Sequence, residues 1–211
     1  MQATSTATRA TWILRAEHEI ILTVLDCLEK VADNSTRAGA LDRRSAHDIL
    51  DFLGTLADRC HHGKEERCLF PALVKKGLPQ DAGPVAVMLA EHEQGRAAIA
   101  GMRAAVVACG RKDSQAVERF NAHARAYVQL LREHIAKENN VLFPMADGML
   151  TEAEQAALLR EFGDVETSDL GAGTHEHYLL LAEDLVQRLG VIPSKPIAVV
   201  GSCCGHGGRC A

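Results

Sequence analysis

The strongest constraint on the fold is a block of eleven residues that occurs twice in the sequence. Residues 61–71 align without a gap with residues 134–144, at an offset of 73 (134 − 61). The two copies share His, Lys, Glu, Leu, Phe and Pro at the same places. A shorter block, Glu-His-Glu, occurs at residues 17–19 and again at 91–93, at an offset of 74 (91 − 17). Because this period is too long for a solenoid unit, the repeat predicts a duplicated helical hairpin.

Each copy of the longer block contains a histidine and a glutamate four residues apart. His61 and Glu65 form one pair, and His134 and Glu138 form the other. On an α-helix this spacing places both side chains on one face, one turn apart, so each pair can hold a metal ion between an imidazole and a carboxylate. A buried carboxylate without a partner costs several kcal/mol. Two divalent cations between the facing pairs would remove that cost.

The shorter block adds one histidine to an apolar helical stripe in each half of the chain. His18 interrupts a stripe of leucine and isoleucine, and His92 interrupts a stripe of methionine and isoleucine. The predicted metal ligands are therefore His18, His61, Glu65, His92, His134 and Glu138. Mixed nitrogen and oxygen ligands suit Fe, Mn or Zn. Six ligands on two ions leave coordination positions open for O₂, peroxide, NO or hydroxide.

Apolar periodicity and turn residues predict an all-α protein built on an up-down-up-down four-helix bundle with additional C-terminal helices. Helices are expected at about residues 11–32, 42–69, 84–109, 114–145, 151–162 and 174–189, with loops at 33–40 and 163–173. Pro71 is expected to disturb the end of the second helix. The expected organisation is a disordered N-terminus at 1–10, the metal-binding bundle at 11–147, C-terminal helices packing on it at 148–190, and a Cys/Gly-rich tail at 191–211.

Composition argues against several classes of function. Hydrophobic residues make up 47% and charged residues 24% of the 211 positions, which are ordinary globular values. A net charge of −5 without a basic stripe argues against nucleic-acid binding. No apolar run approaches the roughly 18 residues of a membrane span, and the N-terminus does not read as a secretory signal. Four of the seven cysteines are scattered without metal-type spacing, so reduced thiols in a cytoplasmic protein are expected.

The sequence pattern indicates less clearly whether a few other residues take part in the metal site. His62 and Glu66 are also four residues apart, but on an α-helix they point about 100° away from the first His/Glu pair, so a surface or supporting role is expected. The sequence leaves open, as the alternative, that His62 adds a ligand. Tyr127 lies two turns before His134 on the same face. Its hydroxyl is a candidate hydrogen-bond donor to a metal-bound ligand, and simple packing is the alternative.

Two histidines of the last helix and the C-terminal tail also contain ligand-type side chains. The sequence leaves open whether His175 or His177 adds an imidazole by closing over the bundle end. The tail lacks the paired Cys-x-x-Cys spacing of structural zinc sites. Its candidate residues are Cys203, Cys204, His206 and Cys210. A disordered tail is expected, with a thiol or metal-transfer role as the alternative.

The repeated blocks resemble the hemerythrin-like (HHE cation-binding) proteins, four-helix bundles that hold a non-haem di-iron centre. The resemblance covers about residues 11–147 and implies that the six predicted ligands bind two iron ions. The oxygen-carrying hemerythrins use five histidines and two carboxylates. They have a further histidine one turn after the third ligand and an aspartate five residues after the last histidine. Here Arg96 and Asn139 stand at those places, and Glu138 lies one residue earlier.

With one histidine fewer, the chain is expected to be closer to bacterial members linked to NO handling, peroxide breakdown or repair of iron centres. The resemblance implies a di-iron protein that reacts with or senses NO, peroxide or O₂ in nitrosative or oxidative stress defence. Iron storage or donation for repair of iron centres is one alternative, and a sensing module without turnover is another. The sequence leaves open whether the protein is an enzyme with a weak peroxide- or NO-consuming activity, and it identifies no protein partner.

Overall fold

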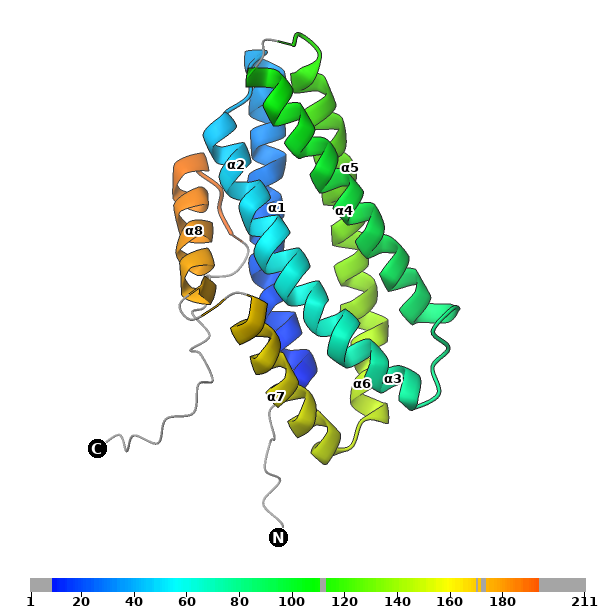
Figure 1. The fold of residues 1–211 in the computed structure, drawn as a ribbon. Helices are drawn as coiled ribbons and strands as arrows, with labels where there is room; N and C mark the ends of the chain where they lie inside the picture. Colours follow the sequence, from blue (N-terminus) through cyan, green and yellow to red (C-terminus); the bar gives the residue numbers. More distant parts are fainter. Residues whose placement is uncertain (1–8, 111–112, 170, 172–173, 194–211) are drawn as a thin grey trace, which may run out of the picture.

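Figure 1 shows the computed structural model of the chain, which describes residues 9–110, 113–169, 171 and 174–193. Four long helical segments run antiparallel to their neighbours and form the bundle. Two shorter C-terminal helices pack beside the first of them. The described residues contain no strand. The predicted all-α, up-down-up-down bundle with additional C-terminal helices is therefore confirmed.

Two of the four long segments change between α-helical and π-helical hydrogen bonding along their length. The uniform segments are α1 (Ala10–Ala38) and α4 (Gly83–Gly110). The second segment consists of α2 (Arg43–Phe52), the π-helical η1 (Leu53–His62) and η2 (Glu65–Leu69), and α3 (Phe70–Lys75). The fourth segment consists of α5 (Ala116–Lys137), the π-helical η3 (Glu138–Leu142) and α6 (Phe143–Met149). The C-terminal helices are α7 (Glu152–Asp169) and α8 (Thr174–Leu189).

A π-helical turn begins at each repeated glutamate and is followed by a proline. η2 begins at Glu65 and precedes Pro71, and η3 begins at Glu138 and precedes Pro144. In an α-helix the proline ring collides with the carbonyl group four residues earlier. The wider π-helical bonding before each proline moves those carbonyl groups out of register with the ring, so the helix continues. The predicted helix end near Pro71 is therefore wrong, and the segment continues to Lys75.

The first predicted loop, residues 33–40, is mostly helical, because α1 continues to Ala38. Ser35 and Thr36 donate side-chain hydrogen bonds to carbonyl groups one turn earlier. Ser35 also donates to the side chain of Asn121 on α5, at 2.7 Å. These hydrogen bonds satisfy the polar side chains within the helix. They could not be predicted from the composition of the segment.

The C-terminal helices partly follow the prediction. α7 begins with the predicted capping box, in which the Thr151 amide and hydroxyl both donate to the Glu154 carboxylate at 2.8 Å. It then continues to Asp169, through most of the predicted loop at 163–173, whereas α8 has the predicted bounds. Among the described residues, no helix is long and apolar enough to cross a membrane. The predictions for residues 1–8 and for the tail cysteines lie outside the described residues.

Buried apolar side chains form two clusters at different levels of the bundle. On α1, His18 lies between Leu14 of one cluster and Ile20 of the other. On α4, His92 likewise follows a residue of one cluster, Met88, and precedes a residue of the other. The repeated His/Glu pairs of the second and fourth segments fall into the same interval. The bundle therefore contains a polar layer enclosed between two apolar clusters.

Candidate metal centre

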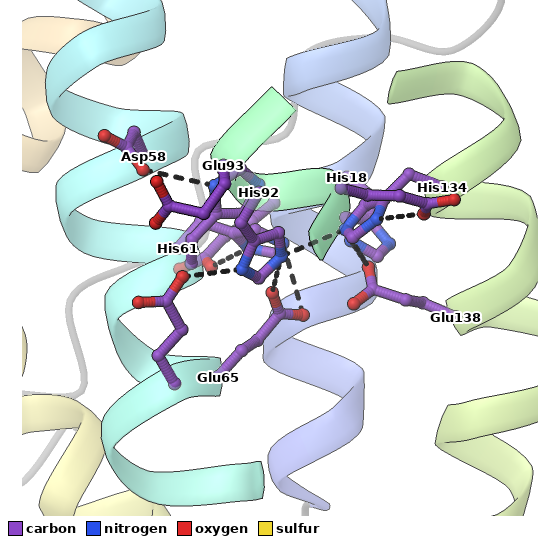
Figure 2. Close-up of polar contacts among 12 residues, drawn as sticks. His18, Asp58, His61, Glu65, His92, Glu93, His134 and Glu138 are labelled. Carbon is purple, nitrogen blue, oxygen red and sulfur yellow. Dashed lines mark hydrogen bonds and ion pairs between the residues drawn. The ribbon is translucent and has the colours of Figure 1, made fainter. Parts of the chain in front are cut away.

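The structure brings all six predicted ligands together in the polar layer. Figure 2 shows these side chains pointing toward one another from different helical segments, and each residue is at most 1% exposed. Their ligand-type atoms form two groups, and within each group these atoms lie within 4.8 Å of one another. The first group is His18, His61, Glu65 and Glu138, and the second is His62, Glu65, His92 and His134. Because Glu65 belongs to both groups, the two positions are adjacent.

Each of the two glutamates lies between two imidazoles. The distances from carboxylate to Nε2 are 3.2 Å (His18) and 3.3 Å (His134) for Glu138, and 3.6 Å (His61) and 3.5 Å (His92) for Glu65. The Nε2 atoms of His92 and His134 are 3.2 Å apart. The four imidazoles therefore direct Nε2 into the same small volume that holds both carboxylates.

Several buried polar atoms of this layer have no hydrogen-bond partner. They are Nε2 of His18, Nε2 of His61, and both carboxylate oxygens of Glu65 and of Glu138. Buried polar atoms nearly always have a partner, and each one without a partner costs about 1–3 kcal/mol. Cations coordinated between them would satisfy these atoms, and the mixed nitrogen and oxygen donors fit Fe, Mn or Zn. The residues present therefore fit a pair of metal ions.

The outer nitrogen of each of the four imidazoles faces a hydrogen-bond acceptor. The Nδ1 contacts are His61 with Glu17 (2.8 Å), His92 with Glu66 (2.7 Å), His134 with Glu91 (3.0 Å) and His18 with Asn139 (3.0 Å). A carboxylate can only accept, so Nδ1 donates to it and Nε2 keeps its lone pair for the centre of the layer. Histidines that bind metals are usually oriented in this way.

These outer acceptors follow the repeat with one exception. Glu17 and Glu91 are equivalent at an offset of 74 (91 − 17), and both are glutamates. Glu66 and Asn139 are equivalent at an offset of 73 (139 − 66), but a carboxamide replaces the carboxylate. Glu17 and Glu91 were not predicted to take part in the site, although their recurrence beside a histidine in both halves of the chain was a usable signal. Glu66 and Asn139 could not be recognised in this way, because the two equivalent positions hold different residue types.

A lysine lies behind each of the two equivalent glutamates. Lys64 donates to Glu17 and Lys137 donates to Glu91, and the two lysines are themselves equivalent in the repeat. Lys64 is fully buried under α7, where it also donates to Glu166 at 2.5 Å. The Lys137 side chain is 40% exposed. Helix α7 therefore contacts the outer layer of the site at Lys64.

The buried carboxylates and imidazoles of the layer shift one another's pKa values. Burial would raise the pKa of Glu138, but the His134 imidazole outweighs burial and holds the pKa well below its usual range. Burial would lower the pKa of His92, but Glu65 and Glu66 outweigh burial and raise the pKa to about 9. At neutral pH and without a metal, a proton therefore occupies His92 beside the Glu65 carboxylate. A metal ion must displace such a proton, so binding should release protons.

His62 is buried in the site, which excludes the surface role and leaves the supporting and ligand roles. Only 3% of the residue is exposed, and its ring stacks on His92 with centroids 3.8 Å apart and planes at 14°. Burial, followed by the charge on His92, lowers the pKa of His62 well below its usual value, which keeps the ring neutral. The π-helical η1 ends at His62 and turns less per residue than an α-helix. An α-helical estimate of its direction therefore did not apply.

The remaining candidates lie outside the two ligand groups. Tyr127 is buried, and its hydroxyl has no hydrogen-bond partner. Its bond to a metal-bound ligand stays a prediction. His175 lies near Glu17 and Glu166, behind the His61 side of the layer. Neither His175 nor His177 belongs to the two groups.

Comparison with known proteins identifies the family. The Hemerythrin HHE cation binding domain family matches residues 9–146, and the chain belongs to this family. The Uncharacterized protein Rv1995 of Mycobacterium tuberculosis is 27% identical over 161 residues, which are 76% of this chain and 60% of that protein. The Iron-sulfur cluster repair protein DnrN of Neisseria gonorrhoeae is 35% identical over 106 residues, which are 44% of this chain and 64% of that protein. The chain thus spans less than two thirds of the length of these relatives, and no solved structure matches it.

We predict that Lys64→Met destabilises the iron-free protein much more than the equivalent substitution Lys137→Met. Without Lys64, the buried Glu17 carboxylate loses its cation, and breaking a buried pair in this way costs about 3–5 kcal/mol. The Lys137 pair is partly exposed, so its loss should cost about 1 kcal/mol or less. Urea unfolding at neutral pH measures both free energies, and equal values would contradict the prediction.

The ion pair of Lys64 with Glu17 predicts that the free energy of unfolding depends on pH. Burial raises the pKa of Glu17, but Lys64 and His61 outweigh burial and lower the pKa from 4.5 to about 2. Glu17 therefore stabilises the fold fully above pH 4.5, and this contribution is lost as the pH falls toward about 2. The difference in unfolding free energy between wild type and Lys64→Met should narrow over that range.

Proposed function

We propose that the chain binds two iron ions in the polar layer. The proposed ligands are His18, His61, Glu65, His92, His134 and Glu138. The proposal rests on the buried carboxylate oxygens and imidazole nitrogens without partners, which two cations would satisfy. The same donors would also suit Mn or Zn. The resemblance to the di-iron hemerythrins favours iron.

We further propose that the centre reacts with or senses a small oxidant or gas, namely NO, peroxide or O₂. When bound, a pair of non-haem irons supplies one-electron redox chemistry and open coordination positions. The chain supplies an apolar enclosure, in which Phe143 stacks on His18 at 5.4 Å and Phe70 stacks on His92 at 5.9 Å. Together with the two apolar clusters, these rings make the surroundings unfavourable for charged metabolites. A small neutral molecule is therefore the favoured ligand.

Iron storage or donation for repair of iron centres is the second candidate. One relative is named as an iron-sulfur cluster repair protein, although the match covers 44% of this chain. The acceptor behind His18 is the neutral amide of Asn139, whereas carboxylates stand behind His61, His92 and His134. A neutral acceptor makes His18 a less basic ligand than its counterparts. An ion on the His18 side would therefore be the more easily released of the two.

We predict that the aerobically purified protein contains two iron ions per chain, and that both repeated glutamates are needed to hold them. Glu65→Ala and Glu138→Ala each remove two oxygen donors from the buried layer, so each variant should lose one or both ions. Metal analysis with a visible spectrum measures the loss. Glu118→Ala, at an exposed position, is the control and should keep both ions. Full iron loading of the Glu65→Ala/Glu138→Ala double variant would refute the ligand assignment.

We predict that the reduced, iron-loaded protein consumes NO or peroxide rather than storing O₂ reversibly. Six protein ligands on two ions leave room for both a substrate and a hydroxide. Stopped-flow mixing with O₂, with NO and with peroxide measures the reaction. A stable complex that releases O₂ under vacuum over many cycles would contradict the prediction. Transfer of iron to an acceptor without consumption of any of the three would favour the donation candidate.

A further inference from the structure

His62 is the one residue of the two ligand groups without a ligand-type counterpart in the other half of the repeat. The equivalent position holds Ile135, which is also buried. A ring nitrogen of His62 lies within 4.8 Å of the ligand atoms of Glu65, His92 and His134. Its ring centroid is 3.8 Å from that of His92 and 5.7 Å from that of His134. His62 therefore breaks the symmetry of the duplicated hairpin inside the polar layer itself.

The outer nitrogen of His62 has an acidic partner, as do three of the four other imidazoles. Nδ1 of His62 faces Oδ1 of Asp58 at 3.4 Å. Because a carboxylate accepts and cannot donate, Nδ1 carries the proton and Nε2 keeps a lone pair. The same arrangement orients His61 through Glu17. A histidine that binds a metal through one ring nitrogen usually donates a hydrogen bond to a carboxylate through the other. The contact between His62 and Asp58 fits this pattern.

Arg96 fixes the carboxylates behind His62 and His92. Its Nε donates to Asp58 at 2.8 Å, and another of its nitrogens donates to Glu66 at 2.7 Å. Asp58 is the partner of Nδ1 of His62, and Glu66 is the partner of Nδ1 of His92. One guanidinium therefore connects the outer partners of two stacked imidazoles. Because its donors form a rigid planar fork, the guanidinium restricts the positions of both carboxylates.

We propose that His62 is a fifth imidazole ligand, on the ion held by His92 and His134, and that Arg96 is a positioning residue for it. The inference rests on the proposed di-iron function and extends it. The two ions are then inequivalent. The ligand set then contains five histidines and two carboxylates, and the ion beside His62 has one open coordination position fewer than with six ligands.

The test replaces His62 by the residue of the other repeat, in the variant His62→Ile. Iron per chain, the Mössbauer spectrum and the rate of iron release to a chelator are measured on wild type and variant. We expect the signal of one iron to change while the other stays, and one ion to be released at least about 10-fold faster, since even the loss of an outer partner weakens metal binding by that factor. Loss of one or both ions from a chain with unchanged helical circular dichroism also supports the proposal. His47→Ile, the same change at a side chain that is 79% exposed, is the control and should match wild type.

A second variant keeps the proposal testable if His62→Ile does not fold. Arg96→Met releases Asp58 and Glu66 at a position whose side chain is 32% exposed. We expect the Mössbauer signal of the same iron to shift, whereas a merely structural role of Arg96 would leave both signals unchanged. Wild-type spectra and release rates in His62→Ile, or an unchanged spectrum in Arg96→Met, would overturn the proposal. Wild-type protein that binds no iron would instead refute the proposed function, before any variant is made.

Discussion

The structure depends on how two buried carboxylates are accommodated in an otherwise apolar bundle. Glu65 and Glu138 are fully buried, and their oxygens have no hydrogen-bond partner. Apolar clusters lie on both sides of them. Imidazole nitrogens at 3.2–3.6 Å are the only polar groups that the ion-pair contacts of the described residues place against them. Such a layer is stable only with protons or cations between its donor atoms.

The internal repeat of the sequence accounts for the approximate symmetry of this layer, and the two halves depart from that symmetry at three places. The Lys64 side is closed by α7, whereas its counterpart Lys137 is partly exposed. His18 has an amide behind it, although the equivalent imidazole has a carboxylate. His62 adds an imidazole to one side, where the other side has an isoleucine. The two halves of the site therefore differ in the charge of one outer acceptor, in the exposure of the outer lysine and in the number of imidazoles.

The convergence of the six residues in one layer could be predicted from the sequence, because each residue recurs in register within an apolar stripe. The same logic failed for His62, which has no counterpart and lies in a π-helical turn that a sequence pattern does not reveal. The helix ends at Pro71 and at the loop near residue 33 were misplaced for a related reason. In both cases local hydrogen bonding, by a π-helical turn or by Ser35 and Asn121, overrides the tendency of the residue type. Glu17 and Glu91 contact His61 and His134 on other helical segments, so their roles could not be predicted without the arrangement of the helices.

The central claim is that metal binding satisfies this layer and so contributes directly to the stability of the fold. The most direct measurement is the free energy of unfolding of the chain, freed of metal with a chelator and then reloaded with iron. Binding to the folded state alone should add about 2.7 kcal/mol when free iron exceeds its dissociation constant about 100-fold. A higher unfolding free energy with iron than without it is the predicted result. Equal stability of the metal-free and iron-loaded chains would contradict the account.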